Sequence, residues 1–169
     1  MKRFLIGVLA LTVLVAGFFG WARFLADPPF GPIPSGRLRG ELSPPPADWS
    51  IAEGIQHLPV EHRGDGLPWS TRSWFILYEG RVHLIRASLF GSGLHERLRE
   101  DPRVRVRVAG RLYDQVAKQV DVAGVYSAAL PALARRQFAI AIEGEVRPLA
   151  GNPPVETWIW RLDDPPVAR

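Results

Sequence analysis

Residues 72–111, RSWFILYEGRVHLIRASLFGSGLHERLREDPRVRVRVAGR, carry the strongest structural pattern in this chain. Residues 73–78 are rich in aromatic and β-branched side chains and are nearly all apolar, which is typical of a strand covered on both faces. Glu79 and Gly80 then predict a tight turn, and residues 82–87 return as a second strand. The stretch therefore predicts a β-hairpin, the clearest one in the sequence.

The second half of the same stretch predicts a short helix followed by a strand with one solvated face. Leu94 and Leu98 are four residues apart, so a helix over 94–100, ended by Pro102, would bury both on one face. In residues 103–108 arginine and valine alternate strictly. This period of two predicts a strand whose valines face the core and whose arginines face water.

The remaining elements complete a small β domain. Further strands are predicted over 56–62, 112–120 and 156–162, and a second helix over 125–137 is interrupted by Pro131. Five to seven strands with two small helices indicate a compact, barrel-like sheet. Because the valines should face its interior, Val106→Asp is expected to be strongly destabilising, whereas Arg105→Asp is expected to be nearly silent.

Residues 4–22 form an uncharged, overwhelmingly apolar run in which Thr12 is the polar exception. At about 1.5 Å per residue, a helix of this length can cross the hydrocarbon core of a bilayer. Bulky residues such as Phe18 and Trp21 stand where a signal peptidase requires small ones. A retained transmembrane anchor over residues 1–26 is therefore favoured, and a cleaved signal peptide is the alternative.

The charges that flank this run predict its orientation. Lys2 and Arg3 precede it, whereas the positive charge of Arg23, which follows it, is offset by the negative charge of Asp27. Positive charge is retained on the cytoplasmic side of a membrane helix. The prediction is a single-pass membrane protein whose folded domain is extracytoplasmic and which contacts membrane lipid through its N-terminal helix.

A segment rich in proline and glycine, residues 27–47, separates the anchor from the domain at residues 48–169. Proline fixes φ and lacks an amide donor, so an extended, stiff spacer is predicted. The alternative is that part of this segment packs along the surface of the domain. The domain itself is long enough for one hydrophobic core.

Composition and motifs exclude several functional classes. The net charge is +4, but the 21 basic residues are scattered among 17 acids without a block or stripe, so no nucleic-acid partner is expected. No nucleophile elbow or phosphate-loop signature is present. His57, His83 and Glu61 can be drawn as a metal site, but hydrogen-bonded or surface histidines are the favoured interpretation, and no metal is predicted.

The loop and helix after the hairpin form a candidate phosphate-binding site. Residues 91–93, Gly-Ser-Gly, open the helix at 94–100, and a helix N-terminus presents free amides and partial positive charge. Arg72, Arg86 and Ser88 could add charged and hydroxyl donors there. From composition and spacing alone, an ordinary loop with solvated arginines is the favoured interpretation.

The whole run 72–111 resembles the split β-barrel flavoproteins, which include pyridoxamine-phosphate-oxidase-like proteins and deazaflavin-dependent nitroreductases. In both, a hairpin leads to a short loop and helix. An Asn/Asp-Pro-Arg-Val step, here residues 101–104, then enters an alternating strand that ends in Gly-Arg, here Gly110 and Arg111. The resemblance implies a mainly β fold, a six-stranded split β-barrel with two short helices, that forms a homodimer and binds FMN or a deazaflavin.

The resemblance also implies roles for individual residues. Arg72 would occupy the position of a phosphate-binding arginine, the backbone of Ala87 and Ser88 would line the edge of the isoalloxazine ring, and Ser92 would meet the phosphate. The basic residue that both families place after the second strand is absent here, and Arg97 could replace its charge. The candidate cofactor-binding residues are Arg72, Trp74, Arg86, Ala87, Ser88, Ser92 and Arg97.

Two functional hypotheses follow. The first is a membrane-anchored oxidoreductase that binds FMN or a deazaflavin and transfers a hydride to or from an unknown substrate, with no catalytic residue predicted. The second is a cofactor-free split barrel that acts as a binding or assembly module at the membrane. The neutral loop at 89–92 and the extracytoplasmic location favour the second hypothesis.

Overall fold

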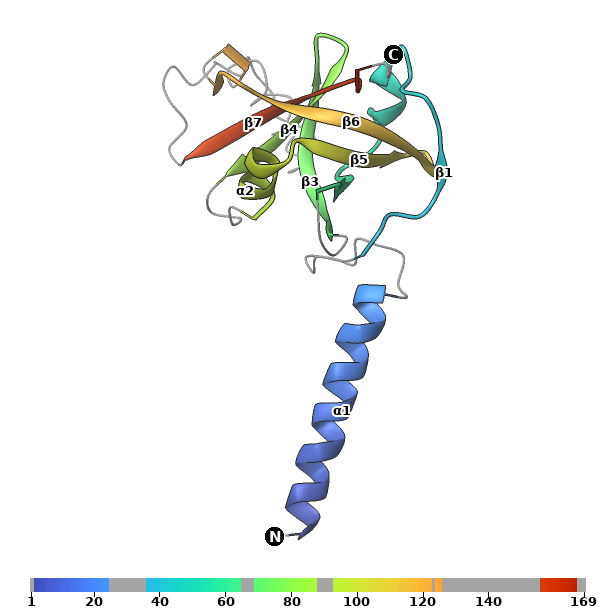
Figure 1. The fold of residues 1–169 in the computed structure, drawn as a ribbon, viewed down its shortest axis with the longest axis vertical. Coiled ribbons are helices and arrows are strands. Elements are labelled where there is room, and N and C mark those ends of the chain that lie inside the picture. Colours follow the sequence, from blue (N-terminus) through green and yellow to red (C-terminus); the bar gives the residue numbers. More distant parts are fainter. Residues whose placement is uncertain are drawn as a thin grey trace, which may run out of the picture.

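The structure is a computed structural model that describes residues 2–24, 36–64, 69–87, 93–122, 124–125 and 156–166. It contains the helices α1 (Lys2–Phe24) and α2 (Gly93–Glu100), a 3-10 turn η1 (Trp49–Ala52), and the strands β1 (Glu41–Leu42), β2 (Leu58–His62), β3 (Trp69–Tyr78), β4 (Arg81–Ala87), β5 (Arg103–Val108), β6 (Arg111–Val120) and β7 (Thr157–Asp163) (Figure 1). The helix predicted over 125–137 lies outside the described residues, apart from Val125.

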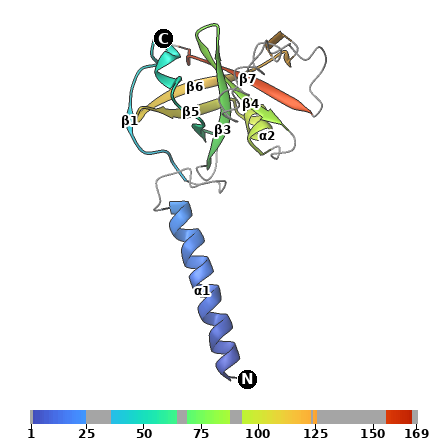
Figure 2. The same ribbon diagram turned by 180° about the vertical axis from the view of Figure 1, so that it is seen from behind.

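Six of the strands close into an antiparallel barrel. The strand order is β6-β5-β2-β3-β4-β7, and β7 also pairs with β6, so the sheet returns to its starting strand. Two views from opposite sides show the strands wrapped around one interior (Figure 1, Figure 2). The predicted six-stranded barrel is therefore confirmed, and β1 is a short addition that pairs in parallel with β6.

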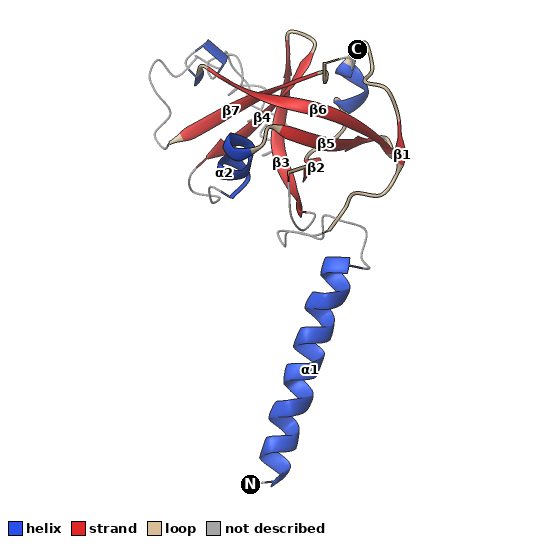
Figure 3. Ribbon diagram, in the orientation of Figure 1, coloured by secondary structure: helices blue, strands red, loops and turns tan. Residues whose placement is uncertain are grey.

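The alternating pattern of β5 has the predicted orientation. Val104, Val106 and Val108 are at most 1% exposed and join the main core cluster. Leu94 and Leu98 of α2 also enter this cluster, so the helix covers one end of the barrel (Figure 3). The burial of both sets confirms the periodicities read from the sequence.

The arginines on the outer face of β5 are not simply solvated. Arg105 donates from Nε to Oδ1 of Asp114 at 2.6 Å and from Nη2 to Oδ2 at 2.8 Å. This bidentate pair holds the pKa of the Asp114 carboxyl below its ordinary value, mainly through the hydrogen bonds from Arg105. Arg105→Asp would set two carboxylates side by side. It is therefore expected to destabilise the barrel rather than to be nearly silent.

Helix α1 carries its large apolar side chains on the outside. Among its described side chains they are exposed by 45% at Trp21 to 73% at Phe4. The hydroxyl of Thr12 donates to the Val8 carbonyl oxygen at 2.9 Å, so its hydrogen bond is made within the helix. Within the described residues no helix meets the length and apolarity required of a membrane span. The transmembrane anchor stays a prediction.

The described part of the proline-rich segment packs against the barrel. Leu38 is buried, and its backbone N–H donates to Oε2 of Glu61 at 2.7 Å. Further along, β1 pairs with the start of β6, and the Ser43 N–H donates to the Leu112 carbonyl oxygen at 2.9 Å. We call residues 36–43 the strap. Over these residues the chain follows the alternative weighed for the linker, because it lies along the domain.

Candidate anion-binding site

The strand register sorts the predicted site residues onto two faces of the sheet. In an antiparallel pair, residues directly opposite each other share a face, and neighbours along a strand alternate. Arg86 lies two residues after Leu84, which faces the core, so it shares the inner face. Arg72 and Trp74 flank the inward-facing Ser73 on β3 and lie on the outer face. Arg72 and Arg86 are therefore not brought together.

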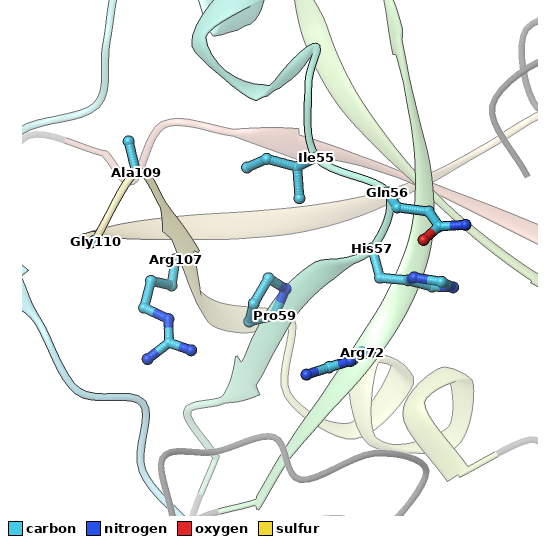
Figure 4. A pocket seen from close by; sticks show the side chains of 8 residues that line it. All are labelled: Ile55, Gln56, His57, Pro59, Arg72, Arg107, Ala109 and Gly110. Carbon is cyan, nitrogen blue, oxygen red and sulfur yellow. The ribbon is translucent and has the colours of Figure 1, made fainter.

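An open pocket of about 280 Å³ lies on the outer face around Arg72 (Figure 4). Its lining consists of Ile55, Gln56, His57, Pro59, Arg72, Arg107, Ala109 and Gly110. None of these eight residues is acidic. Figure 4 shows the guanidinium groups of Arg72 and Arg107 on either side of Pro59. The pocket thus combines two permanent positive charges with space for a ligand.

Strand β2 is the element that assembles this pocket. It pairs with β3 on one side, where Pro59 lies opposite Arg72, and with β5 on the other. A two-residue turn with positive φ, Ala109 at 49° and Gly110 at 78°, ends β5 and closes the rim. Arg72 and Arg107 are distant in sequence, and they become neighbours because β2 stands between their strands.

His57 is fixed in one tautomer by a tryptophan. Trp74 donates from Nε1 to Nε2 of His57 at 3.0 Å, and an indole nitrogen can only donate. Nε2 is therefore the acceptor, and the ring hydrogen is on Nδ1. Burial, followed by the charge of Arg72, lowers the pKa of His57, so the ring is neutral at pH 7. The charge of the pocket comes from the two arginines, and His57 adds a neutral donor.

Two predicted arginines, Arg86 on the inner face of β4 and Arg97 on α2, lie near the aromatic residues at the α2 end of the barrel. Arg86 is opposite Trp158 in the β4–β7 register, and burial lowers its pKa. His95 of α2 stacks on Trp158 with ring centroids 4.0 Å apart. The guanidinium carbon of Arg97 lies 5.0 Å from the ring centroid of Trp69, a cation–π contact. This group is separate from the outer pocket.

The other predicted residues add little to either group. Ala87 ends β4 opposite Thr157, and Ser88 and Ser92 lie outside the described residues. Of the seven candidates, Arg72 lines the pocket and Trp74 reaches it through His57. Sequence reasoning missed Arg107, which the alternating pattern marked only as solvated. It favoured a hydrogen-bonded or surface role for His57, and the hydrogen bond from Trp74 agrees with this, but it did not place His57 at this pocket. In the described part of the chain, no three His, Asp or Glu side chains gather as a metal site.

The fold and this pocket define a closed six-stranded barrel with a cationic site on its outer face. No protein-family model and no curated relative matches the chain. A candidate pyridoxamine 5'-phosphate oxidase from Listeria innocua is similar with a TM-score of 0.49 and 12% sequence identity, and the match covers 67% of this chain and 86% of that one. An FAD-binding protein from Mesorhizobium loti is similar with a TM-score of 0.48 and 13% identity, over 69% of this chain and 86% of that one. An F420 reductase is similar with a TM-score of 0.45 and 17% identity, over 70% of this chain and 94% of that one. These are similarities of fold, and the description of the barrel rests on its own strand pairing.

Proposed function

We propose that this protein binds a phosphate-bearing flavin or deazaflavin on the outer face of the barrel and acts as an oxidoreductase. The observation that carries the proposal is the pair of guanidinium groups, Arg72 and Arg107, at one open pocket without an acidic lining residue. Guanidinium groups bind phosphate oxygens through charge-assisted, frequently bidentate hydrogen bonds.

The residues present fit such a ligand. Arg72 and Arg107 would hold its phosphate, and the Nδ1–H of His57 would add a neutral donor. Trp74, on the same face and hydrogen-bonded to His57, would offer an aromatic surface to the ring. When bound, the flavin or deazaflavin supplies hydride chemistry, and the contribution of the chain is to bind, orient and shield it.

A cofactor-free module that binds an anionic ligand is the second candidate. One observation favours it: Arg86 and Arg97, both predicted to contact a cofactor, lie among the aromatic residues at the α2 end and not at the pocket. Both candidates require anion binding by the pocket, and they differ in whether a flavin-type ring accompanies the anion.

Titration of the full chain in detergent with FMN and with a deazaflavin phosphate tests the proposal. We expect saturable quenching of tryptophan fluorescence. Arg72→Ala and Arg107→Ala should each weaken binding by about 1.5–3 kcal/mol, or roughly 10- to 150-fold, because each removes a charge-assisted contact. Arg97→Ala is the matched control and should change the dissociation constant by less than about twofold, since its guanidinium faces Trp69.

Each other outcome has a distinct meaning. If Arg97→Ala weakened ligand binding as much as Arg72→Ala does, the ligand would bind at the α2 end, as the family resemblance implied. Binding of inorganic phosphate without binding of either cofactor would leave the cofactor-free module. No binding of any of the three would contradict an anion site at this pocket.

We also propose that α1 holds the barrel at a membrane, with the barrel on the extracytoplasmic side. The support is the set of exposed large apolar side chains along α1, from Phe4 to Trp21, because contiguous exposed apolar surface marks sites of contact with a protein or a membrane. The satisfied hydroxyl of Thr12 is compatible with an apolar environment. A homodimer, which the resemblance implies, is a further proposal that sedimentation of the full chain in detergent would measure.

Fractionation of cells that express the full chain tests the membrane proposal. We expect the protein to stay in the membrane pellet through extraction with alkaline carbonate. Transfer of the apolar side chains of α1 from lipid into water would carry a large free-energy cost. The barrel should be cleaved by protease added to right-side-out vesicles. Release by carbonate, or a mature N-terminus between residues 20 and 30 in mass spectrometry, would favour the cleaved signal peptide.

A further inference from the structure

His57 and Trp74 form a donor–acceptor pair at the pocket on the outer face. His57 lines the pocket and immediately precedes β2, and Trp74 lies on the outer face of β3. Nε1 of the indole donates to Nε2 of the imidazole at 3.0 Å. The ring hydrogen of His57 is therefore on Nδ1, and Nε2 is the ring nitrogen that can still take up a proton.

A proton on Nε2 of His57 and the hydrogen bond from Trp74 exclude each other. An indole N–H can donate but cannot accept, and a protonated imidazole carries a donor on each nitrogen. Protonation would set two N–H groups against each other across 3.0 Å, so the imidazolium forms only once the two rings have separated. Trp74 therefore stabilises the neutral ring, and it also fixes which nitrogen carries the hydrogen.

The charges around His57 oppose its protonation as well. The charged residues that line the pocket are Arg72 on β3 and Arg107 on β5, and both are cations. Burial, followed by the charge of Arg72, lowers the pKa of His57. An anion bound beside Arg72 would offset this repulsion and attract a positive imidazole. The ligand to which the pocket is suited is thus also one that would favour protonated His57.

We propose that an anion binds this pocket together with one proton, which is taken up at Nε2 of His57 while the hydrogen bond from Trp74 breaks; this inference rests on the proposed function. The proton comes from water, and no bond between heavy atoms forms or breaks. Because coupling between two binding events is reciprocal, the proton and the anion each strengthen the binding of the other by the same factor. Anion affinity should therefore rise as the pH falls through the range in which His57 titrates in the complex, and it should be constant at higher pH.

Calorimetric titration of the full chain in detergent with sodium sulfate tests this coupling. Sulfate keeps its two charges from about pH 5.5 to 8.5, whereas the phosphate of FMN itself titrates near about pH 6. The affinity for sulfate should rise by about threefold or more between about pH 8.5 and 5.5. Titrations in two buffers that differ in ionisation enthalpy should show proton uptake at about pH 6.5 and no uptake at about pH 8.5.

Two substitutions test whether the proton enters at His57 in exchange for Trp74. His57→Gln can still accept from the indole through its amide oxygen but does not titrate, so the pH dependence should be lost. Trp74→Phe removes the opposing donor and keeps an aromatic ring, so the midpoint of the pH dependence should move up by about 0.5–1 pH unit. A merely structural role of Trp74 would leave that midpoint unchanged. Trp69→Phe, at the tryptophan that faces Arg97, is the matched control and should not move it.

The wild-type measurements decide the matter even if a variant does not fold. Sulfate binding without proton uptake at any pH would overturn the coupling. A pH dependence that survives His57→Gln, or an unchanged midpoint in Trp74→Phe, would overturn it as well. If FMN still binds at about pH 8.5 under any of these results, the proposed function stands and the coupling alone fails. If neither sulfate nor FMN binds the wild-type chain, both fail.

Discussion

Val106→Asp is expected to unfold the barrel. Val106 is fully buried on β5, opposite Val60 on one neighbouring strand and Tyr113 on the other. An aspartate there would place an unpaired carboxylate in an apolar core, at a cost of at least about 4 kcal/mol. Domains of this size are stable by only about 5–15 kcal/mol in total. Thermal unfolding followed by circular dichroism should show a midpoint lowered by more than about 10 °C, or no cooperative transition.

Arg111→Asp is the matched control for this substitution. Arg111 opens β6 opposite Val108 and beside Glu41 of β1. Both of these charged side chains are exposed, so the new carboxylate stays in water, where its repulsion from Glu41 is screened. Its effect should stay within about 1 kcal/mol. Equal destabilisation by the two substitutions would contradict the register assigned to β5 and β6.

Glu61→Ala is expected to have the second-largest effect. The substitution leaves the buried N–H of Leu38 without its acceptor and removes the carboxylate that Arg63 contacts. The cost should be about 3 kcal/mol, between that of an unsatisfied buried amide and that of a broken buried ion pair. Urea denaturation should show a lower midpoint with an unchanged slope, because the strap is a small part of the surface exposed on unfolding.

Glu41→Ala separates this effect from a general loss of charge on the strap. Glu41 is exposed in β1, and its replacement should cost less than about 0.5 kcal/mol. Glu61→Gln should fall between the two alanine variants, since the amide oxygen still accepts from Leu38. A cost below about 1 kcal/mol for Glu61→Ala would mean that the strap contributes little to the stability of the domain.

Local patterns in the sequence were sufficient to predict the hairpin, the short helix and the side of β5 that faces the core. The tight turn at Glu79 and Gly80 has positive φ at both positions, as a two-residue hairpin turn requires. The buried valines of β5 and the buried leucines of α2 follow periods of two and of nearly four. These features depend on backbone geometry within a few residues, so they can be read without knowing which strands are neighbours.

The sequence alone therefore determined the hairpin, the short helix and the side of β5 that faces the core, because alternation along a strand is fixed by its own backbone. Only the tertiary structure decided which strands lie side by side. Arg72 and Arg107 meet because β2 pairs with both β3 and β5, and Arg72 and Arg86 stay apart because the register puts them on opposite faces. Glu61, which alternation alone would expose, is buried because the strap folds back over it. Such pairings join residues far apart in the chain, and they are selected by the burial of the whole core rather than by any local pattern.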